Sequence, residues 1–364
     1  MTYNASLNRT GEGQLQADLA TPDNAQARAV AEVVQRTDPD VLLLNEFDHD
    51  AEGRSAELFR DNYLAVSQNG QDPVDYPYVY TAPVNTGVPS GLDLDQDGTV
   101  GGGGDAWGFG LFPGQYGMVL YSTYPIDIQD IRTFRNFRWA DMPGNLMPID
   151  FYTPEQAGQL RLSSKSHWDV PVRIGTTTVH VLASHPTPPS FDGPEDRNGR
   201  RNHDEIRFWA DYVSGPAASS YVHDDEGGRG GLKPGDRFVV MGDQNADPHD
   251  GDSWPGSIQQ LLEHPRVQDP LPSSAGGPEA AARQGGANLR HVSDPAYDTA
   301  DFHDDPAPGN LRVDYVLPSR NLRVVHAGVW WPRPGEPGAE LTGEHPFPAS
   351  DHRPVYVDVH VGGR

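Results

Sequence analysis

The chain has 364 residues, with 52 acidic and 27 basic side chains, a formal net charge of −25, and no cysteine. These totals exclude disulfides and thiolate zinc sites, and so negative a field disfavours tight non-specific binding to nucleic acid, although one local basic cleft could override it. The apolar content suffices for a core, no run reaches the roughly 20 apolar residues of a membrane span, and no signal peptide opens the chain.

The expected elements begin with a very short strand. Only three residues precede Asn4, so we expect either that the start is trimmed or that the strand is short and holds Asn4 less firmly. A helix is predicted next, because apolar residues recur at helical spacing from Ala27 to Val34, and either Thr21 or Asp23 can cap it. The further expected strands are 41–48, 116–126, 165–174, 177–186, 237–245, 311–319, 322–332 and 352–361, and the further expected helices are 55–64, 202–213 and 257–264.

Two long stretches lack this periodicity. They are a Gly- and Asp-rich insertion at about 83–115 and an irregular loop, rich in Gly, Pro, Ala and Asp, at about 270–310. No internal repeat and no clean linker divides the chain. We therefore expect residues 1–364 to form a single domain of layered strands and helices.

Polar side chains suited to hydrolysis stand in or at the end of six expected strands. They are Asn4, Glu46, His185, Asp243 with Asn245, Asp314, and Asp351 with His352. Hard oxygen ligands suit magnesium, calcium or manganese, and histidines beside carboxylates suit acid–base work on water. The combination predicts metal-assisted attack of water on phosphorus. Each motif alone has a simpler interpretation, since Gly-Asp-x-Asn is often only a turn, but six in order are hard to explain as coincidence.

The stretch "VVMGDQNADP" shows how such a strand end is built. Val239, Val240 and Met241 anchor the strand, and Gly242 permits close backbone approach. We expect Asp243 and Asn245 to project together, because strand residues two apart share a face. The Asp-Pro pair that follows turns the chain away.

The ordered motifs resemble those of the exonuclease–endonuclease–phosphatase superfamily, which includes pancreatic deoxyribonuclease, abasic-site endonucleases, neutral sphingomyelinases and inositol-polyphosphate 5-phosphatases. The resemblance covers nearly the whole chain through "YNASLN", "DVLLLNE", "LASHP", "GDQNAD", "RVDYVLPS" and "SDHRPVYVDV". It implies an α/β fold of four layers, in which two mixed β-sheets pack face to face and helices flank them, as in deoxyribonuclease I. The region around 160–205 resembles a secreted bacterial subgroup.

The resemblance also implies roles for the residues at the strand ends. Glu46 would be the main ligand of Mg²⁺ or Mn²⁺, with Asn4 and Asp351 nearby. Asp243 and Asn245 would position the attacking water and the phosphate, and His185 would bind a phosphate oxygen. His352, oriented by Asp314, would be the general base or would stabilise the transition state. Whether Asp243 or His352 takes the proton is left open at this point.

A charged loop after His185 suggests the kind of substrate. Arg197 and Arg200 stand in it, and Lys165 and His167 lie just upstream. Guanidinium groups bind phosphate well, so we expect these four residues to contact a phosphate; the alternative is an ordinary solvated loop. A compact cluster of mixed sign suits a small polar substrate better than a long duplex.

We therefore predict a divalent-metal-dependent phosphoester hydrolase for small phosphorylated substrates, monomeric and without a nucleic-acid partner. The first alternative is a non-specific extracellular endonuclease, which would be expected to carry a basic face that this sequence does not suggest. The second is a phosphodiesterase like phospholipase C or sphingomyelinase. For that function a lipid-facing rim could include Trp107, Phe109, Phe112, Trp330 and Trp331, unless these aromatic residues belong to the core.

The insertion contains half of a calcium loop. Asp93, Asp95, Asp97 and Gly98 have the spacing of an EF-hand, but Gly104 stands where the bidentate Glu belongs. We expect a structural Ca²⁺ here, with an acidic flexible loop as the alternative. Calcium at extracellular concentrations would fit a secreted or periplasmic protein.

Overall fold

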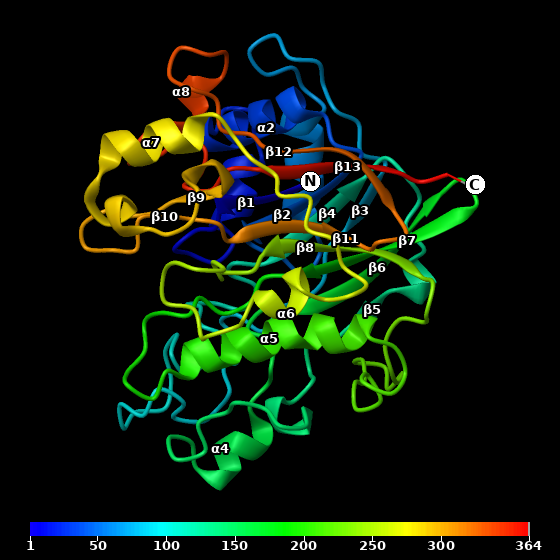
Figure 1. The fold of residues 1–364 in the computed structure, drawn as a ribbon, viewed down its shortest axis with the longest axis vertical. Coiled ribbons are helices and arrows are strands. Elements are labelled where there is room, and N and C mark those ends of the chain that lie inside the picture. Colours follow the sequence, from blue (N-terminus) through cyan, green and yellow to red (C-terminus); the bar gives the residue numbers. More distant parts are fainter. Residues whose placement is uncertain (363–364) are drawn as a thin grey trace.

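Two β-sheets stack face to face between helices in the computed structural model, which describes residues 1–362. In Figure 1 the helix α2 covers the outer side of one sheet and α5 the outer side of the other. The first sheet has the order β12 (Arg323–Val329), β13 (Val355–His360), β1 (Thr2–Leu7), β2 (Val41–Phe47), β4 (Met118–Ser122), β3 (Tyr78–Tyr80). The second has the order β11 (Asp314–Pro318), β8 (Arg237–Asp243), β7 (Thr177–Ser184), β6 (His167–Ile174), β5 (Arg132–Thr133).

Both sheets are mixed. The pairs β1–β2 and β7–β8 are parallel, and the other pairs are antiparallel. The α/β fold of two mixed sheets flanked by helices is therefore as predicted. Within residues 1–362, no helix is long and apolar enough to cross a membrane.

The helices are short except for two. Near the first sheet are α1 (Gln14–Leu19), α2 (Ala25–Thr37), α3 (Arg54–Phe59) and a π-helical turn (Arg60–Leu64). The others are α4 (Pro154–Gln159), α5 (Arg197–Val213), α6 (Gln259–Leu262), α7 (Gly276–Gln284) and α8 (Ala339–Thr342), with 3-10 turns at Ile128–Asp130, Trp139–Asp141, Gly286–Arg290 and Pro295–Tyr297.

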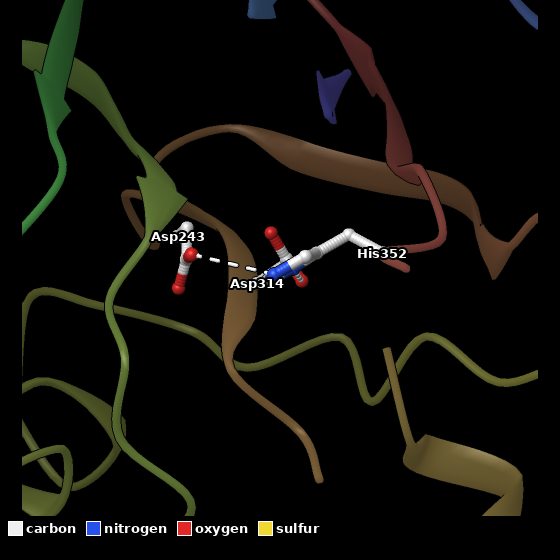
Figure 2. Close-up of side chains that lie close together, drawn as sticks. All are labelled: Asp243, Asp314 and His352. Carbon is white, nitrogen blue, oxygen red and sulfur yellow. Dashed lines mark hydrogen bonds and ion pairs between the residues drawn. The ribbon is translucent and has the colours of Figure 1, made fainter. Parts of the chain in front are cut away.

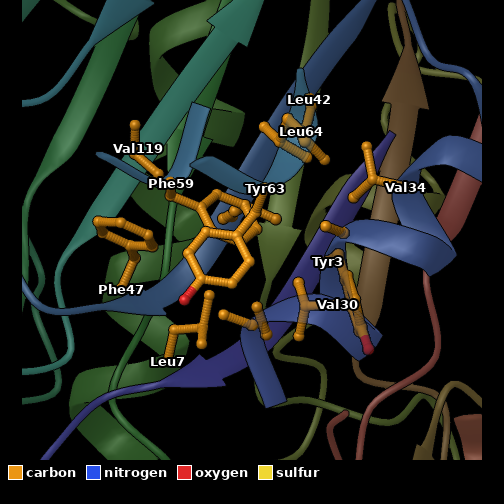
Figure 3. Close-up of a cluster of buried hydrophobic side chains, with 14 of the residues drawn as sticks. Tyr3, Leu7, Val30, Val34, Leu42, Phe47, Phe59, Tyr63, Leu64 and Val119 are labelled. Atoms are coloured by element: carbon orange, nitrogen blue, oxygen red, sulfur yellow. The ribbon is translucent and has the colours of Figure 1, made fainter. Parts of the chain in front are cut away.

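Three apolar layers hold these elements together, and strand alternation explains how one strand serves two of them. In β2, Leu42 and Leu44 face the helices while Leu43 faces the other sheet, because successive side chains point to opposite faces. Figure 3 shows the helix-side layer, where Tyr3 and Leu7 of β1 pack with the side chains of α2 and α3. The central layer lies between the sheets, and the third lies under α5.

The first strand is longer than expected. It spans Thr2–Leu7, pairs with both β2 and β13, and buries Asn4 at its centre, so the second of the two expectations, a short strand with a less firmly held Asn4, was wrong. The strand forms from so few residues because flanking strands on both sides satisfy its backbone groups.

Three other details differ from the predictions. The cap of α2 is Asn24, whose side chain accepts from the Ala27 amide, and not Thr21 or Asp23. Helix α5 starts at Arg197, so part of the predicted charged loop is helical. The stretch predicted as irregular contains α7 and a ribbon of β9 (Ala300–Asp301) and β10 (Asn310–Leu311), whereas 83–115 forms only isolated bridges within the described residues.

Candidate active site

A cavity of about 1660 Å³ opens at the edge where strands of both sheets end. Its wall includes the expected residues Glu46, Lys165, His185, Arg197, Asp243, Asn245, Asp351 and His352. Asn4 and Asp314 lie directly behind this wall, in contact with Asp243 and His352. The fold therefore brings the strand-end residues together although they are spread from the first strand to the last.

Asp243 ends β8 and receives hydrogen bonds on both oxygens. Asn4 Nδ2 donates to Oδ2 at 3.1 Å, and the Asn245 amide donates to Oδ1 at 2.8 Å. Gly242, at φ 138°, allows this approach, because a Cβ there would lie 1.9 Å from the Ser184 carbonyl oxygen. Any side chain at 242 would push apart the neighbouring ends of β7 and β8.

Asn245 reaches the cavity in a different way from the one predicted. It lies beyond the end of β8 in a left-handed conformation, φ 51°, so strand alternation does not apply to it. Its side-chain amide donates to the Pro186 carbonyl at 3.1 Å, and this links it to the loop that carries His185. A turn held by the Asp243 carboxylate, rather than a strand face, places the two side chains together.

His352 and Asp314 form a buried pair beside Asp243 (Figure 2). The Nδ1 of His352 lies 2.8 Å from Asp314 Oδ2, and its Nε2 lies 3.8 Å from Asp243 Oδ2. Burial opposes the charged imidazolium, but the charges of Asp314 and Asp243 outweigh it and raise the pKa of His352 to about 10. Burial raises the pKa of Asp243, while the charge of His352 opposes that rise.

His185 occupies the other side of Asp243. Its Nε2 lies 3.5 Å from Asp243 Oδ2, and its buried Nδ1 has no hydrogen-bond partner within residues 1–362. Burial lowers its pKa well below the usual value, and the charges of Lys165 and His352 add to that effect. Its surroundings therefore favour the neutral imidazole, which has one N–H to donate.

Glu46 and Asp351 form the acidic side of the cavity. Glu46 is the next-to-last residue of β2, at φ 56°, and accepts from Asn8 Nδ2 at 2.7 Å, while Ser6 Oγ donates to Asp351 at 3.1 Å. Burial raises the pKa of Glu46, and the charge of Asp351 raises it further. Carboxylate oxygens suit a hard divalent cation, and a metal held by Glu46 and Asp351 stays a prediction.

A sequence model of the endonuclease/exonuclease/phosphatase family matches residues 1–352. The chain belongs to this family. Members of the family are hydrolases that act on phosphoester bonds. A comparison with curated proteins found no match.

Solved structures of the endonuclease/exonuclease/phosphatase family share the fold. A family member from Beutenbergia cavernae is 18% identical, with a TM-score of 0.54 over 100% of this chain and 71% of that one. A mannosyl-6-phosphatase from Bacteroides thetaiotaomicron is 13% identical, with a TM-score of 0.48 over 99% and 98%. A beta toxin variant from Staphylococcus aureus, with bound magnesium ions, is 14% identical, with a TM-score of 0.47 over 98% and 97%.

Two of the four residues predicted to contact phosphate, His167 and Arg200, do not line the cavity of this chain. His167 packs between Phe208 and Trp209, with ring centroids 4.9 and 5.0 Å away, and is not part of the cavity wall. Arg200 stacks on Trp254, 4.2 Å from the ring centroid. The error has a physical reason: β6 begins at His167, so the loop residue Lys165 and the strand residue His167 do not share a face.

Lys165 and Arg197 do line the cavity, but only Arg197 has side-chain partners in the described chain. Arg197 pairs with Glu195 and lies over Phe151. Lys165 is only 6% exposed, and its side-chain nitrogen makes no hydrogen bond or ion pair within residues 1–362. Because Lys165 lines the cavity, that nitrogen is available to a ligand there.

Two groups of side chains in the described chain have the spacing of metal ligands. One is the buried group of Asp243, Asp314 and His352, and the other is the predicted calcium group of Asp93, Asp95 and Asp97. In each, one ligand atom per residue lies within 4.8 Å of the others. Asp95 also lines the cavity. Calcium at the second group stays a prediction.

The aromatic residues considered as a lipid-facing rim mostly belong to the core. Phe112 and Trp331 are buried, and Trp107 and Trp330 pack against core clusters. Only Phe109 is exposed, at 63%. Phe191, which the sequence did not suggest, is 90% exposed on the cavity wall.

Several supporting residues were not predicted. Asn8 contacts Glu46 as described, and Arg353 holds the turn of Asp351 and His352 by donating to the carbonyls of Ser350 and His352. Arg353 also pairs with Asp301 at 2.9 Å. The only sequence signal for either residue was its place within a quoted motif, "YNASLN" or "SDHRPVYVDV", and a motif gives no contact.

Proposed function

We propose that this chain is a divalent-metal-dependent hydrolase of small phosphate esters that acts by attack of water on phosphorus. The observation that carries the proposal is Lys165, whose amino group has no protein partner in the described chain and which lies on the same cavity wall as His185 and Asp243. A phosphoryl group is the ligand that would meet both the cation and the neutral imidazole donor.

We assign the metal to the acidic side of the cavity. Glu46 and Asp351 would hold it, with the Asn4 side-chain oxygen nearby, and the raised pKa of Glu46 is the feature that a cation would relieve. When bound, Mg²⁺ or Mn²⁺ would neutralise the charge that develops on the phosphoryl oxygens. The group Asp243, Asp314 and His352 is better used in acid–base chemistry, because a short hydrogen bond already joins His352 to Asp314.

We assign proton acceptance to Asp243. His352 is held as an imidazolium by its two carboxylate neighbours, so it stabilises charge and cannot accept a proton at neutral pH. Asp243 has a raised pKa, which suits a base, and Asn4 and Asn245 fix its two oxygens. The water would lie between Asp243 and the phosphorus that Lys165 and His185 orient.

The charge of the cavity supports a small substrate. Carboxylates outnumber Lys and Arg among the residues of its wall. Such a site repels a polyanion but tolerates one phosphate next to the metal and Lys165. Export from the cell is part of the proposal and rests on the sequence resemblance alone.

One observation favours a lipid phosphodiester as a second candidate. Phe191 and Phe109 are exposed and border the same cavity from two different loops. Hydrolysis of phosphatidylcholine or sphingomyelin in vesicles, together with loss of that activity in Phe191→Ser, would favour it over the first proposal.

Chelation followed by readdition of Mg²⁺, Mn²⁺ or Ca²⁺ tests the proposal. Each sample receives p-nitrophenyl phosphate, bis-p-nitrophenyl phosphate or plasmid DNA. We expect metal-dependent turnover of a small ester with intact plasmid. Nicked plasmid with little small-ester turnover would instead identify a nuclease, and no turnover of any phosphoester would contradict the proposal.

The chain has two lysines, which supply a matched pair of variants. Lys165→Met should reduce kcat/KM by roughly 100-fold or more, because it removes a cation from the phosphate site while keeping the apolar stem. Lys233 is exposed and away from the cavity wall, so Lys233→Met should have the activity of the wild type. Equal activity of both variants would remove Lys165 from the site.

A further inference from the structure

Three loops of the second sheet meet at the cavity, and each carries a cavity residue one or two positions beyond the end of its strand. The first precedes β6 and carries Lys165, the second follows β7 and carries His185, and the third follows β8 and carries Asn245. Backbone pairing reaches His167 and Ser184 between β6 and β7 and Asp243 between β8 and β11, whereas between β7 and β8 it stops at Ala183 and Met241. Beyond these residues, contacts other than strand pairing hold the loops in place.

Helix α5 supplies those contacts through a buried polar face. Asn202 and Glu205 are both 0% exposed and lie one turn apart. Glu205 accepts from the Ser164 amide at 2.7 Å through Oε1 and from the Thr187 amide at 2.6 Å through Oε2. Asn202 Nδ2 donates to the Thr187 carbonyl at 2.9 Å and to the Gln244 carbonyl at 2.8 Å.

These four hydrogen bonds link the three loops in series. Glu205 joins the loop before β6 to the loop after β7, and Asn202 joins the loop after β7 to the loop after β8. Each bonded backbone atom lies within two residues of Lys165, His185 or Asn245. Ser164 strengthens the first link, because its hydroxyl also donates to Glu205 Oε1, at 3.2 Å.

Burying a carboxylate costs desolvation free energy that an apolar side chain would not. An apolar side chain of similar size would pack under the loops without desolvating a charge. A carboxylate provides what an apolar group does not, namely two acceptors at a fixed separation that hold two backbone amides. The Glu205 carboxylate therefore holds the two loops at a fixed separation, in addition to packing α5 against the sheet.

We propose that Glu205 and Asn202 are positioning residues that set the spacing of Lys165, His185 and Asn245 in the cavity. The inference rests on the proposed function, since these three residues are assigned there to the phosphate and the water. Neither Glu205 nor Asn202 lines the cavity, so neither touches substrate.

The adjacent residue Asp204 provides a matched control. It is also 0% exposed and carboxylic, but it accepts from Trp139 Nε1 and the Leu146 amide, both at 2.6 Å, in the layer away from the cavity. Glu205→Gln and Asp204→Asn therefore make the same chemical change at neighbouring positions of one helix. Glu205 contacts the loops at the cavity, whereas Asp204 contacts Trp139 and Leu146.

The test compares both variants in the full chain with added Mg²⁺ and bis-p-nitrophenyl phosphate. We expect kcat to fall by roughly 10- to 100-fold in Glu205→Gln with little change in KM, because misplaced groups weaken the transition state more than binding. Asp204→Asn should keep kcat within about twofold; both of these bonds end on Oδ2, so the amide oxygen of Asn can keep them while the buried carboxylate is removed. Equal loss of kcat in both variants, at equal folded fraction, would overturn the proposal.

Hydrogen–deuterium exchange gives a readout that does not need activity. The Ser164 and Thr187 amides should exchange faster in Glu205→Gln and not in Asp204→Asn; unchanged exchange would overturn the proposal. If Glu205→Gln does not fold, Asn202→Ser makes the same test on the link from Thr187 to Gln244, and wild-type kcat in it would overturn the role of Asn202. Absence of turnover in the wild type would contradict the proposed function alone, because the exchange result decides this inference separately.

Discussion

At the scale of single residues, two of the aspartate–histidine pairs in the described chain differ mainly in their surroundings. Asp314 and His352 stand at the cavity, with Asp243 as a second acid, whereas Asp169 and His180 are joined at 2.7 Å on strands β6 and β7, away from the cavity wall. In both pairs Nδ1 of the histidine contacts the aspartate at nearly the same distance. What differs is the second ring nitrogen, Nε2, because only the histidine at the cavity can use it in catalysis.

This difference gives a prediction with an internal control. Asp314→Asn should reduce kcat by roughly 100-fold or more, because the pKa of His352 falls when the charge that favours the imidazolium is removed. Asp169→Asn should lower the unfolding free energy but leave kcat near that of the wild type. Steady-state kinetics with bis-p-nitrophenyl phosphate and urea unfolding measure both, and a wild-type kcat in Asp314→Asn would contradict the assigned role.

A second prediction concerns Glu46. Glu46→Gln should raise the Mg²⁺ concentration needed for half-maximal activity by about tenfold or more, since a neutral amide is a weaker ligand for a hard cation. The control is Glu32→Gln, which removes a buried carboxylate paired with Arg36 on α2. An unchanged metal requirement in Glu46→Gln would exclude Glu46 as a ligand. A metal titration after chelation provides the measurement.

The positions of the strand-end residues could be read from the sequence, but not their geometry. Asp243 and Glu46 end runs of apolar residues, and such runs predict buried strands whose last residues reach an edge. Asn245 and His167 show the limit. Their directions depend on a left-handed turn and on the residue at which β6 starts, and neither is encoded in a spacing pattern.

At the scale of elements, strands buried on both faces were predictable because burial requires continuous apolar runs. The strands β3 and β5 were not, because they are short and pair only at the sheet edges. Helix α7 lies in a stretch of Gly, Pro and Ala whose composition favours a loop. Tertiary contacts, rather than local preference, form such elements.

Strand β6 carries a prediction about acid stability. Burial lowers the pKa of His167 to about 4, from an ordinary value near 6.5. Between these values the unfolded chain binds a proton and the folded chain does not, so the folded state loses stability as the pH falls through this range. The shift corresponds to roughly 3 kcal/mol.

Urea unfolding at pH 7.5 and pH 5 measures this loss. The non-titrating variant His167→Gln should show a smaller loss of unfolding free energy on acidification than the wild type, whatever its absolute stability. Other groups titrate in both proteins and cancel in the comparison. Parallel pH dependence in the two proteins would mean that His167 can be protonated in the folded state.

At the scale of the whole molecule, the net charge of −25 works against the compact state. Added salt shortens the screening length from about 30 Å at 0.01 M to about 8 Å at 0.15 M, so NaCl should raise the melting temperature near neutral pH. The same series near the isoelectric point of about 4.7 is the control and should show little change. A melting temperature that falls with NaCl at neutral pH would contradict the argument.

The four-layer fold was predictable because six motifs occur in one order along the chain. The pairing of the strands was not, since the sequence does not show that β13 lies between β12 and β1 or that β11 neighbours β8. Those neighbours are fixed by contacts between distant segments, and periodicity carries no information about them.

The cavity also reports on how the two sheets are placed against each other. Asn4, Glu46 and His352 come from the first sheet and its connections, whereas His185, Asp243 and Asp314 come from the second, and the short contact between His352 and Asp314 crosses from one to the other. A sub-ångström slip of one sheet over the other would leave circular dichroism nearly unchanged but would separate these groups. Turnover is consequently a sensitive measure of sheet alignment. On gentle heating we expect hydrolytic activity to be lost at a lower temperature than the circular dichroism signal of the secondary structure.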